Sequence, residues 1–230
     1  MKSEMNISET TTCTQKSESL KQLSAIWRMR AFLSLLIVLS GILMASAQEG
    51  FNWGLKAGIN ASTQSEIGNI CDDNNVVAGF NGGLAGRYGF NDWLGVRSGL
   101  DFQMKGTLCD KSGMEPDVTN RLNYLLLPVK AEFSASEKAG FKNGQRLFFA
   151  TGPYAGYLLN AKQIKNDVKT DLDSYKNFDF GWSFEIGYQV PVLKKNALQF
   201  SLNYDMGIAE VADNTDRQNK SASFSVAWLF

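Results

Sequence analysis

The last residues of the chain alternate strictly between large apolar side chains and mostly small ones. Successive side chains of a β-strand point to opposite faces of the sheet, so this segment would form a strand with one large apolar face. That face carries Phe224, Val226, Trp228 and Phe230, the last residue. The opposite face carries Ser223, Ser225, Ala227 and Leu229.

Seven earlier segments show the same alternation. In each, large apolar residues share one face, while charged residues, glycines and amides share the other, as Phe178, Phe180 and Trp182 do against Asp179 and Gly181. Eight such segments predict an all-β fold, an eight-stranded antiparallel up-and-down barrel. The earlier seven lie at about 51–61, 76–90, 94–108, 122–135, 146–160, 177–190 and 197–209.

The connections between these segments alternate in length. Short turns follow the second and sixth segments, Asn91–Trp93 and Pro191–Asn196, while 136–145 is longer. Long loops at one rim and short turns at the other are typical of outer-membrane barrels with an apolar outer face. We therefore expect a transmembrane barrel of OmpA/OmpX-like architecture, with periplasmic termini and extracellular loops. Those loops are 63–75, 109–121, 161–176 and 210–219.

The start of the chain has the layout of an export signal. Trp27–Arg30 is a basic flank, Ala31–Met44 is an apolar run, and Ala45–Ala47 is a small-residue cleavage site. We expect 1–47 to be a leader and signal peptide, cleaved after Ala47, and 48–230 to be the barrel domain. Met29 is an alternative start, and an uncleaved N-terminal anchor is the alternative to cleavage.

Charged residues on the polar faces are balanced in sign. Because the interior of an eight-stranded membrane barrel is filled by side chains, buried charges there must pair. The balance predicts a plugged interior held by ion pairs, rather than a general porin. The basic members are Lys56, Arg87, Arg97, Lys105 and Lys130, and the acidic members are Asp101, Glu132, Asp179, Glu185 and Asp205.

The composition argues against several kinds of chemistry. The chain contains no histidine, which removes His-dependent nucleophilic catalysis and the usual zinc ligands. A pair of inward carboxylates could act as acid and base, but a structural ion-pair network is the preferred interpretation. With 23 basic and 23 acidic residues there is no excess of positive charge for nucleic acid. We expect neither an enzyme nor a bound cofactor or metal.

Two cysteines fall in the predicted barrel domain. Cys71 lies in the first long loop and Cys109 at the start of the second, at the same rim. An exported protein can keep a disulfide, so the two are candidates for one. The alternatives are two free thiols or pairing to another chain.

Three short segments resemble a known family. They are Gly152–Leu159, Tyr124–Pro128 and the opening Trp53–Asn60. Together they resemble PorT-like outer-membrane β-barrels of Bacteroides-type bacteria, over essentially all of 50–230. The resemblance implies a role in protein secretion across the outer membrane. Members often carry an acidic residue where this chain has Leu126. The strand that ends in Phe230 resembles the signal by which the barrel assembly machinery recognises its substrates.

These observations lead to one expected function and three alternatives. We expect an integral outer-membrane protein with a filled interior that acts through its loops or barrel wall. Its partners would be outer-membrane lipid, lipopolysaccharide, and other envelope or secretion proteins. The alternatives are an accessory component of a PorT-type secretion system, a small ligand-binding or transport barrel with an open lumen, and a soluble lipocalin-like barrel.

Overall fold

The computed structural model describes residues 50–65, 73–110, 118–141, 144–166, 168–172, 175–192, 196–212 and 217–230. The predicted leader, its cleavage site after Ala47, and Cys71 lie outside the described residues.

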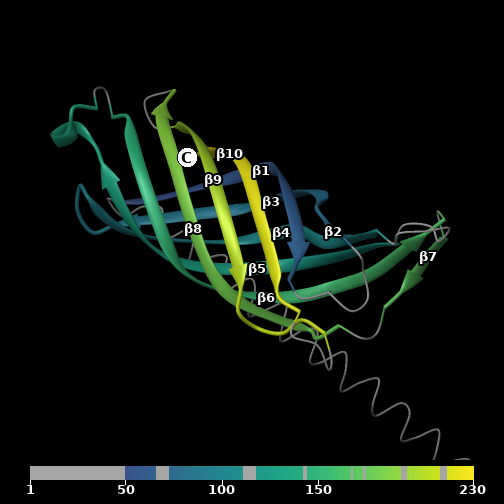
Figure 1. Cartoon of the computed structure of the whole chain (residues 1–230). Helices are drawn as coiled ribbons and strands as arrows, with labels where there is room; N and C mark the ends of the chain where they lie inside the picture. The colour runs from purple at the N-terminus through teal and green to yellow at the C-terminus, as the bar shows by residue number, and fades with distance from the viewer. Residues whose placement is uncertain are drawn as a thin grey trace, which may run out of the picture. The chain divides into compact units, whose positions relative to one another are not determined.

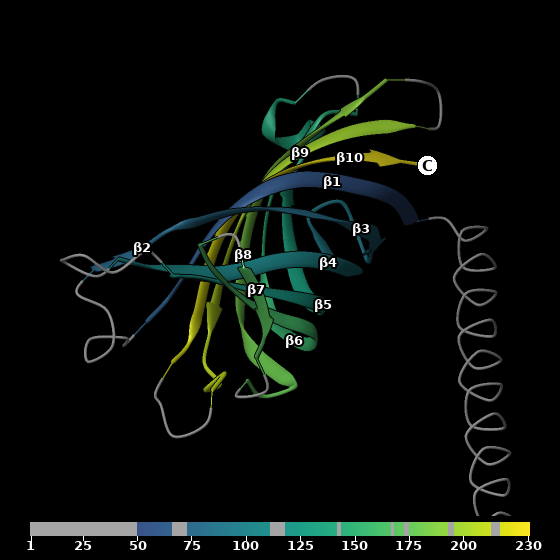
Figure 2. The ribbon, with the colours of Figure 1, turned by 90° about the vertical axis from the view of Figure 1, so that its right-hand side faces the viewer.

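Eight long antiparallel strands close into a barrel (Figures 1 and 2). Each strand pairs with its neighbour along the chain, and β10 closes the ring by pairing with β1. This confirms the predicted eight-stranded fold. The strands are β1 (Phe51–Gln64), β3 (Val77–Gly89), β4 (Leu94–Asp110), β5 (Val118–Ala135), β6 (Arg146–Lys165), β8 (Phe178–Pro191), β9 (Ala197–Gly207) and β10 (Asn219–Leu229).

Three short elements lie in the connections between the long strands. β2 (Asp73–Asn75) pairs with the end of β4, β7 (Val168–Asp171) pairs with the end of β6, and η1 (Glu137–Ala139) is a 3₁₀ turn. The strands also run further than the sequence predicts, because β4, β5 and β6 continue into segments expected to be loops. Polar residues there still satisfy their backbone groups by cross-strand pairing, so the sheet continues beyond its apolar section.

Long and short connections lie at opposite ends of the barrel. The turn rim, as we call it, holds the connections 90–93, 136–145 and 192–196, together with the start of β1 and the end of β10. The loop rim is the opposite end of the barrel, where β1, β4, β6 and β9 end and β3, β5, β8 and β10 begin. β4, β5 and β6, with β7 paired to the end of β6, form the part of the sheet that projects at the loop rim (Figure 1).

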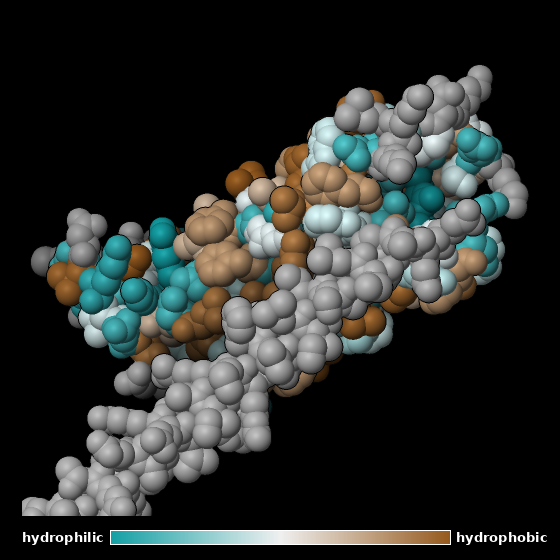
Figure 3. Space-filling model, turned by 180° about the vertical axis from the view of Figure 1, so that it is seen from behind, coloured by the Kyte–Doolittle hydropathy of each residue, from teal (hydrophilic) through white to brown (hydrophobic). Residues whose placement is uncertain are grey.

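The outer wall is apolar. Ile59 and Phe80 are more than half exposed, and so are Leu202 and Phe180 on the other side of the ring. On the face in Figure 3, apolar side chains gather along the middle of the wall and hydrophilic ones toward its ends. Aromatic pairs frame the turn rim, where Trp93 stacks on Phe133 with ring centroids 6.4 Å apart. The charged residues point into the barrel instead, so the apolar face is on the outside.

Among the described residues, no helix is long and apolar enough to cross a membrane.

Candidate functional site

Three guanidinium groups surround one carboxylate near the turn rim. Glu132 is fully buried and accepts from Arg87 Nε at 2.6 Å and from Arg97 Nη1 at 2.7 Å. Arg146 Nη1 lies 3.6 Å from the same carboxylate. Charge-assisted hydrogen bonds of this length offset the loss of hydration that burial imposes on both partners. Glu132 is therefore the centre of the network at this end of the barrel.

A second set of charges lies further along the lumen. Lys130 Nζ is 2.8 Å from Glu185 Oε2, and Arg97 Nη2 is 3.7 Å from Glu185 Oε1. Lys56 and Asp101 form a separate pair at 2.7 Å. Glu185 thus links this second set to the Glu132 cluster through the shared Arg97.

Asp205 is held by neutral donors. The Ser183 hydroxyl and the Asn203 amide each donate to Asp205 Oδ1 at 2.7 Å. Asn203 Oδ1 in turn accepts from Lys130 Nζ at 2.6 Å. Asp205 therefore joins the network through an amide.

The remaining predicted pair, Lys105 and Asp179, lies closer to the loop rim. Lys105 Nζ is 3.2 Å from Asp179 Oδ2, and both side chains are almost completely buried. The Lys105 ammonium also lies 4.5 Å from the centre of the Tyr154 ring and within hydrogen-bond distance of its hydroxyl. The Asn219 amide donates to the same Asp179 oxygen, Oδ2, at 3.0 Å. Amide, phenol and ring thus enclose this ion pair.

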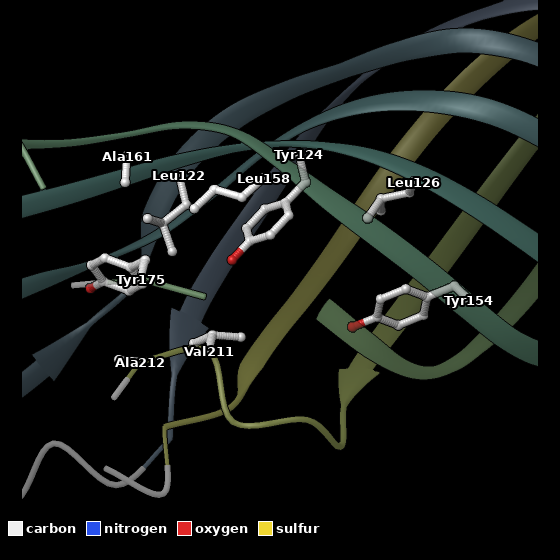
Figure 4. Close-up of a cluster of buried hydrophobic side chains, with 9 residues drawn as sticks. All are labelled: Leu122, Tyr124, Leu126, Tyr154, Leu158, Ala161, Tyr175, Val211 and Ala212. Carbon is white, nitrogen blue, oxygen red and sulfur yellow. The ribbon is translucent and has the colours of Figure 1, made fainter. Parts of the chain in front are cut away.

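A cluster of apolar and tyrosine side chains lies on the loop-rim side of this pair (Figure 4), beside buried polar groups such as Gln64 and Asn219. Tyr175 lies between β7 and β8, and Val211 follows β9; both fold into the mouth of the barrel. The two segments are joined by a hydrogen bond, because Lys176 N–H donates to the Val211 carbonyl at 2.9 Å. Burial raises the pKa of the Tyr175 phenol above its usual value. We call this group the apolar plug. It consists of Leu122, Tyr124, Leu126, Tyr154, Leu158, Ala161, Tyr175, Val211 and Ala212.

Neither the apolar plug nor Arg146 is among the site residues predicted from the sequence. Tyr124–Leu127 and Tyr157–Leu159 place apolar residues on both faces of their strands, so alternation does not show which residues turn inward. That double-faced run was the available signal for an apolar filling inside the barrel. Arg146 opens β6 on the same face as Phe148 and Ala150, so parity within the predicted segment 146–160 was the signal that places it inside.

The interior leaves little free space. The two voids described among the inward side chains hold about 20 Å³ each, roughly the space of one water molecule. A larger hollow of about 740 Å³ is open, and its lining includes outward residues such as Ile59, Phe184 and Phe224 as well as the inward Asn60 and Glu185. Within the described part of the chain, no group of three or more His, Cys, Asp or Glu could hold a metal ion.

The predicted assembly signal forms β10 and the residue after it. Phe224 and Phe230 are outward and exposed, and Val226 and Trp228 share their face. Phe230 N–H donates to the Trp53 carbonyl at 2.7 Å. The predicted disulfide remains a prediction, because Cys71 is outside the described residues and the Cys109 side chain is not described.

The family described as "Outer membrane protein beta-barrel domain" matches residues 46–213. No curated protein sequence matches the chain.

Solved structures of several outer-membrane barrels resemble this one. The neisserial surface protein NspA is 13% identical, with a TM-score of 0.47, over 78% of this chain and 98% of that one. OprG from Pseudomonas aeruginosa is 11% identical, with a TM-score of 0.47, over 79% and 96%. Ail, the attachment invasion locus protein of Yersinia pestis, is 17% identical, with a TM-score of 0.41, over 80% and 100%.

Proposed function

The chain belongs to the outer membrane protein β-barrel domain family, and from that premise we propose that it is a non-enzymatic integral outer-membrane protein that binds other envelope components. In this proposal the filled barrel is a rigid membrane anchor. The contacts are made by the loop rim and the adjoining barrel wall. Outer-membrane lipid, lipopolysaccharide and other envelope proteins are the proposed partners.

The observation that carries this proposal is the double filling of the lumen. The ion-pair network around Glu132 and Glu185 fills the part near the turn rim, and the apolar plug fills the part near the loop rim. A transport or ligand-binding barrel needs an open lumen, as larger barrels have. The voids that the described inward side chains enclose hold only about 20 Å³ each, which favours binding on the outside of the molecule.

The proposed orientation follows from the connection lengths. Outer-membrane barrels have short periplasmic turns and longer extracellular loops. The turn rim would then face the periplasm together with both ends of the barrel domain, and the loop rim would face outward. Under this orientation the strand ending in Phe230 is the segment that the barrel assembly machinery would bind.

One set of measurements tests the membrane location, the closed lumen and the proposed orientation. Unboiled protein from outer membranes should migrate faster than boiled protein on an SDS gel, because a closed barrel resists detergent. Reconstituted protein should show no conductance. An epitope inserted after Asn166, at the loop rim, should be stained on intact cells, and one inserted after Gly140, at the turn rim, only in permeabilised cells. A soluble periplasmic protein without a mobility shift, or the reverse staining, would overturn the proposal.

A secretion role is a finer alternative that rests on the PorT-like segments of the sequence. Leu126 occupies the position where those proteins often carry an acidic residue, and here it packs in the apolar plug. Deleting the gene and measuring the amounts of secreted proteins separates the two proposals. Unchanged secretion would leave the envelope-binding role alone.

A further inference from the structure

Two cations face each other directly across β5 and β6 at the loop rim. Arg121 pairs with Lys162 in the register of these strands. Their neighbours Leu122 and Ala161 are buried inside the barrel, so Arg121 and Lys162 lie on the outer face, where both are exposed. Like charges directly opposite each other destabilise a sheet. This pairing is therefore unfavourable unless anionic groups lie beside it, and Asp171 of β7, on the other side of Lys162, can offset one of the charges.

β7 adds a third cation to the same face. Lys169 pairs with Ile164, two residues beyond Lys162, so it lies diagonally across from Lys162 at about 7–8 Å. Asp171, directly opposite Lys162, is the acidic residue of this face. Among the described residues, none of the three cations forms a salt bridge. We call Arg121, Lys162 and Lys169 the cationic patch; it keeps an excess of positive charge.

The height of the patch on the wall matches a lipid headgroup. From Phe133 near the turn rim to Leu125, every outward side chain of β5 is apolar. The next outward residue toward the patch is the polar Asn123, whose amide donates to Asn160 at 2.7 Å. A strand tilted by about 40° rises about 30 Å between Phe133 and Arg121, and the apolar band of such barrels is about 25 Å tall. The patch therefore lies just beyond the edge of the hydrocarbon.

We propose that Arg121, Lys162 and Lys169 bind the phosphate group of a membrane lipid at the loop rim. A guanidinium can bind two phosphate oxygens at once, while lysine ammonium groups contribute point charges. The choice of membrane leaflet rests on the proposed function. If the loop rim faces outward, the ligand is a phosphorylated glycolipid of the outer leaflet, such as lipopolysaccharide.

The test uses the full chain, folded in a neutral detergent. It is titrated with diphosphoryl lipid A, with the same lipid after removal of its phosphates, and with inorganic phosphate, and bound lipid is counted by native mass spectrometry. The variant is R121Q/K162Q/K169Q. The matched control is K165Q. Lys165 is an exposed cation of β6, like Lys162, but it lies on the opposite face of the strand, where it pairs with Val118 and Val168.

We expect the triple variant to bind diphosphoryl lipid A about tenfold more weakly than the wild type, and K165Q to bind it unchanged. The single variant K169Q, which alters only the short β7, should lose part of the affinity for lipid A. It keeps the test decisive if the triple variant does not fold. Equal binding by wild type and triple variant would overturn the proposal. So would equal binding of the phosphate-free lipid, or inorganic phosphate binding as tightly as the lipid.

Failure here is distinct from failure of the proposed function. If the protein shows the gel shift and the expected staining on cells but does not bind lipid phosphate, only the proposal for the cationic patch is overturned. A protein that never enters the membrane overturns the proposed function itself.

Discussion

Lys105 of β4 and Asp179 of β8 form an ion pair inside the lumen, Nζ to Oδ2 at 3.2 Å, between strands that are not neighbours in the sheet. The pair lies where the charged and apolar parts of the interior meet, against Tyr154. It therefore joins two distant parts of the wall through the interior, in addition to the hydrogen bonds between adjacent strands.

Removing one partner of this pair should strongly destabilise the barrel. D179A leaves the Lys105 ammonium buried without its carboxylate, which should cost about 3–5 kcal/mol. The double variant K105M/D179L replaces the pair by apolar side chains and should recover most of that loss. Urea unfolding, followed by the gel shift of unboiled protein, measures both. A double variant as unstable as D179A would contradict this account.

Glu132 should matter more than any exposed carboxylate. E132Q would leave the guanidinium groups of Arg87, Arg97 and Arg146 without their shared charge, so we expect a loss of about 3–5 kcal/mol. The control is E210Q, because Glu210 pairs with Lys176 in an exposed salt bridge. That change should cost less than about 1 kcal/mol. Similar midpoints of urea unfolding for both variants would argue against a central role for Glu132.

Some inward glycines make room for aromatic rings. A Cβ at Gly187 would collide with the Phe148 ring, whereas one at Gly86, which points outward, would meet its neighbours at ordinary contact distance, 3.6 Å from the Ser98 carbonyl oxygen. We therefore expect G187V to prevent folding or to destabilise the barrel by at least about 1–3 kcal/mol. G86V should fold normally. The shifted band in unboiled samples distinguishes the two, and equal tolerance would show that the lumen can expand.

Alternation along each strand was sufficient to predict the barrel and the inward direction of its charges. Asp179 and Glu185 each lie between two outward apolar residues, so their direction follows from parity alone. Their partners could not be predicted, because which cation meets Asp179 depends on how the closed sheet is staggered. The apolar plug was hidden for another reason: around Tyr124 both faces of the strand are apolar, and the register shifts between Asn123 and Tyr124.

Phe230 should affect assembly more than stability. Its ring lies 4.8 Å from that of Trp53, at the end of the closing β10–β1 pair and exposed on the wall. F230A should fold in detergent with an unfolding midpoint close to that of the wild type. In cells it should accumulate several-fold less in the outer membrane if the terminal aromatic residue is read during assembly. Equal reductions in detergent stability and in cellular level would assign Phe230 a packing role only.

The two fillings of the lumen should block conduction independently. Y124A/Y175A removes two of the three tyrosine rings of the apolar plug, but the salt bridges of Glu132 and Glu185 still fill the lumen near the turn rim. R97A/E132A empties part of that network and leaves the apolar plug in place. Each double variant should therefore remain closed in planar bilayers, while the quadruple variant should show discrete conductance steps. Unboiled gels verify that each protein is folded before recording. Conductance in Y124A/Y175A alone would mean that the ion-pair network does not seal the barrel. The plug would then be the element that keeps this barrel from acting as a pore.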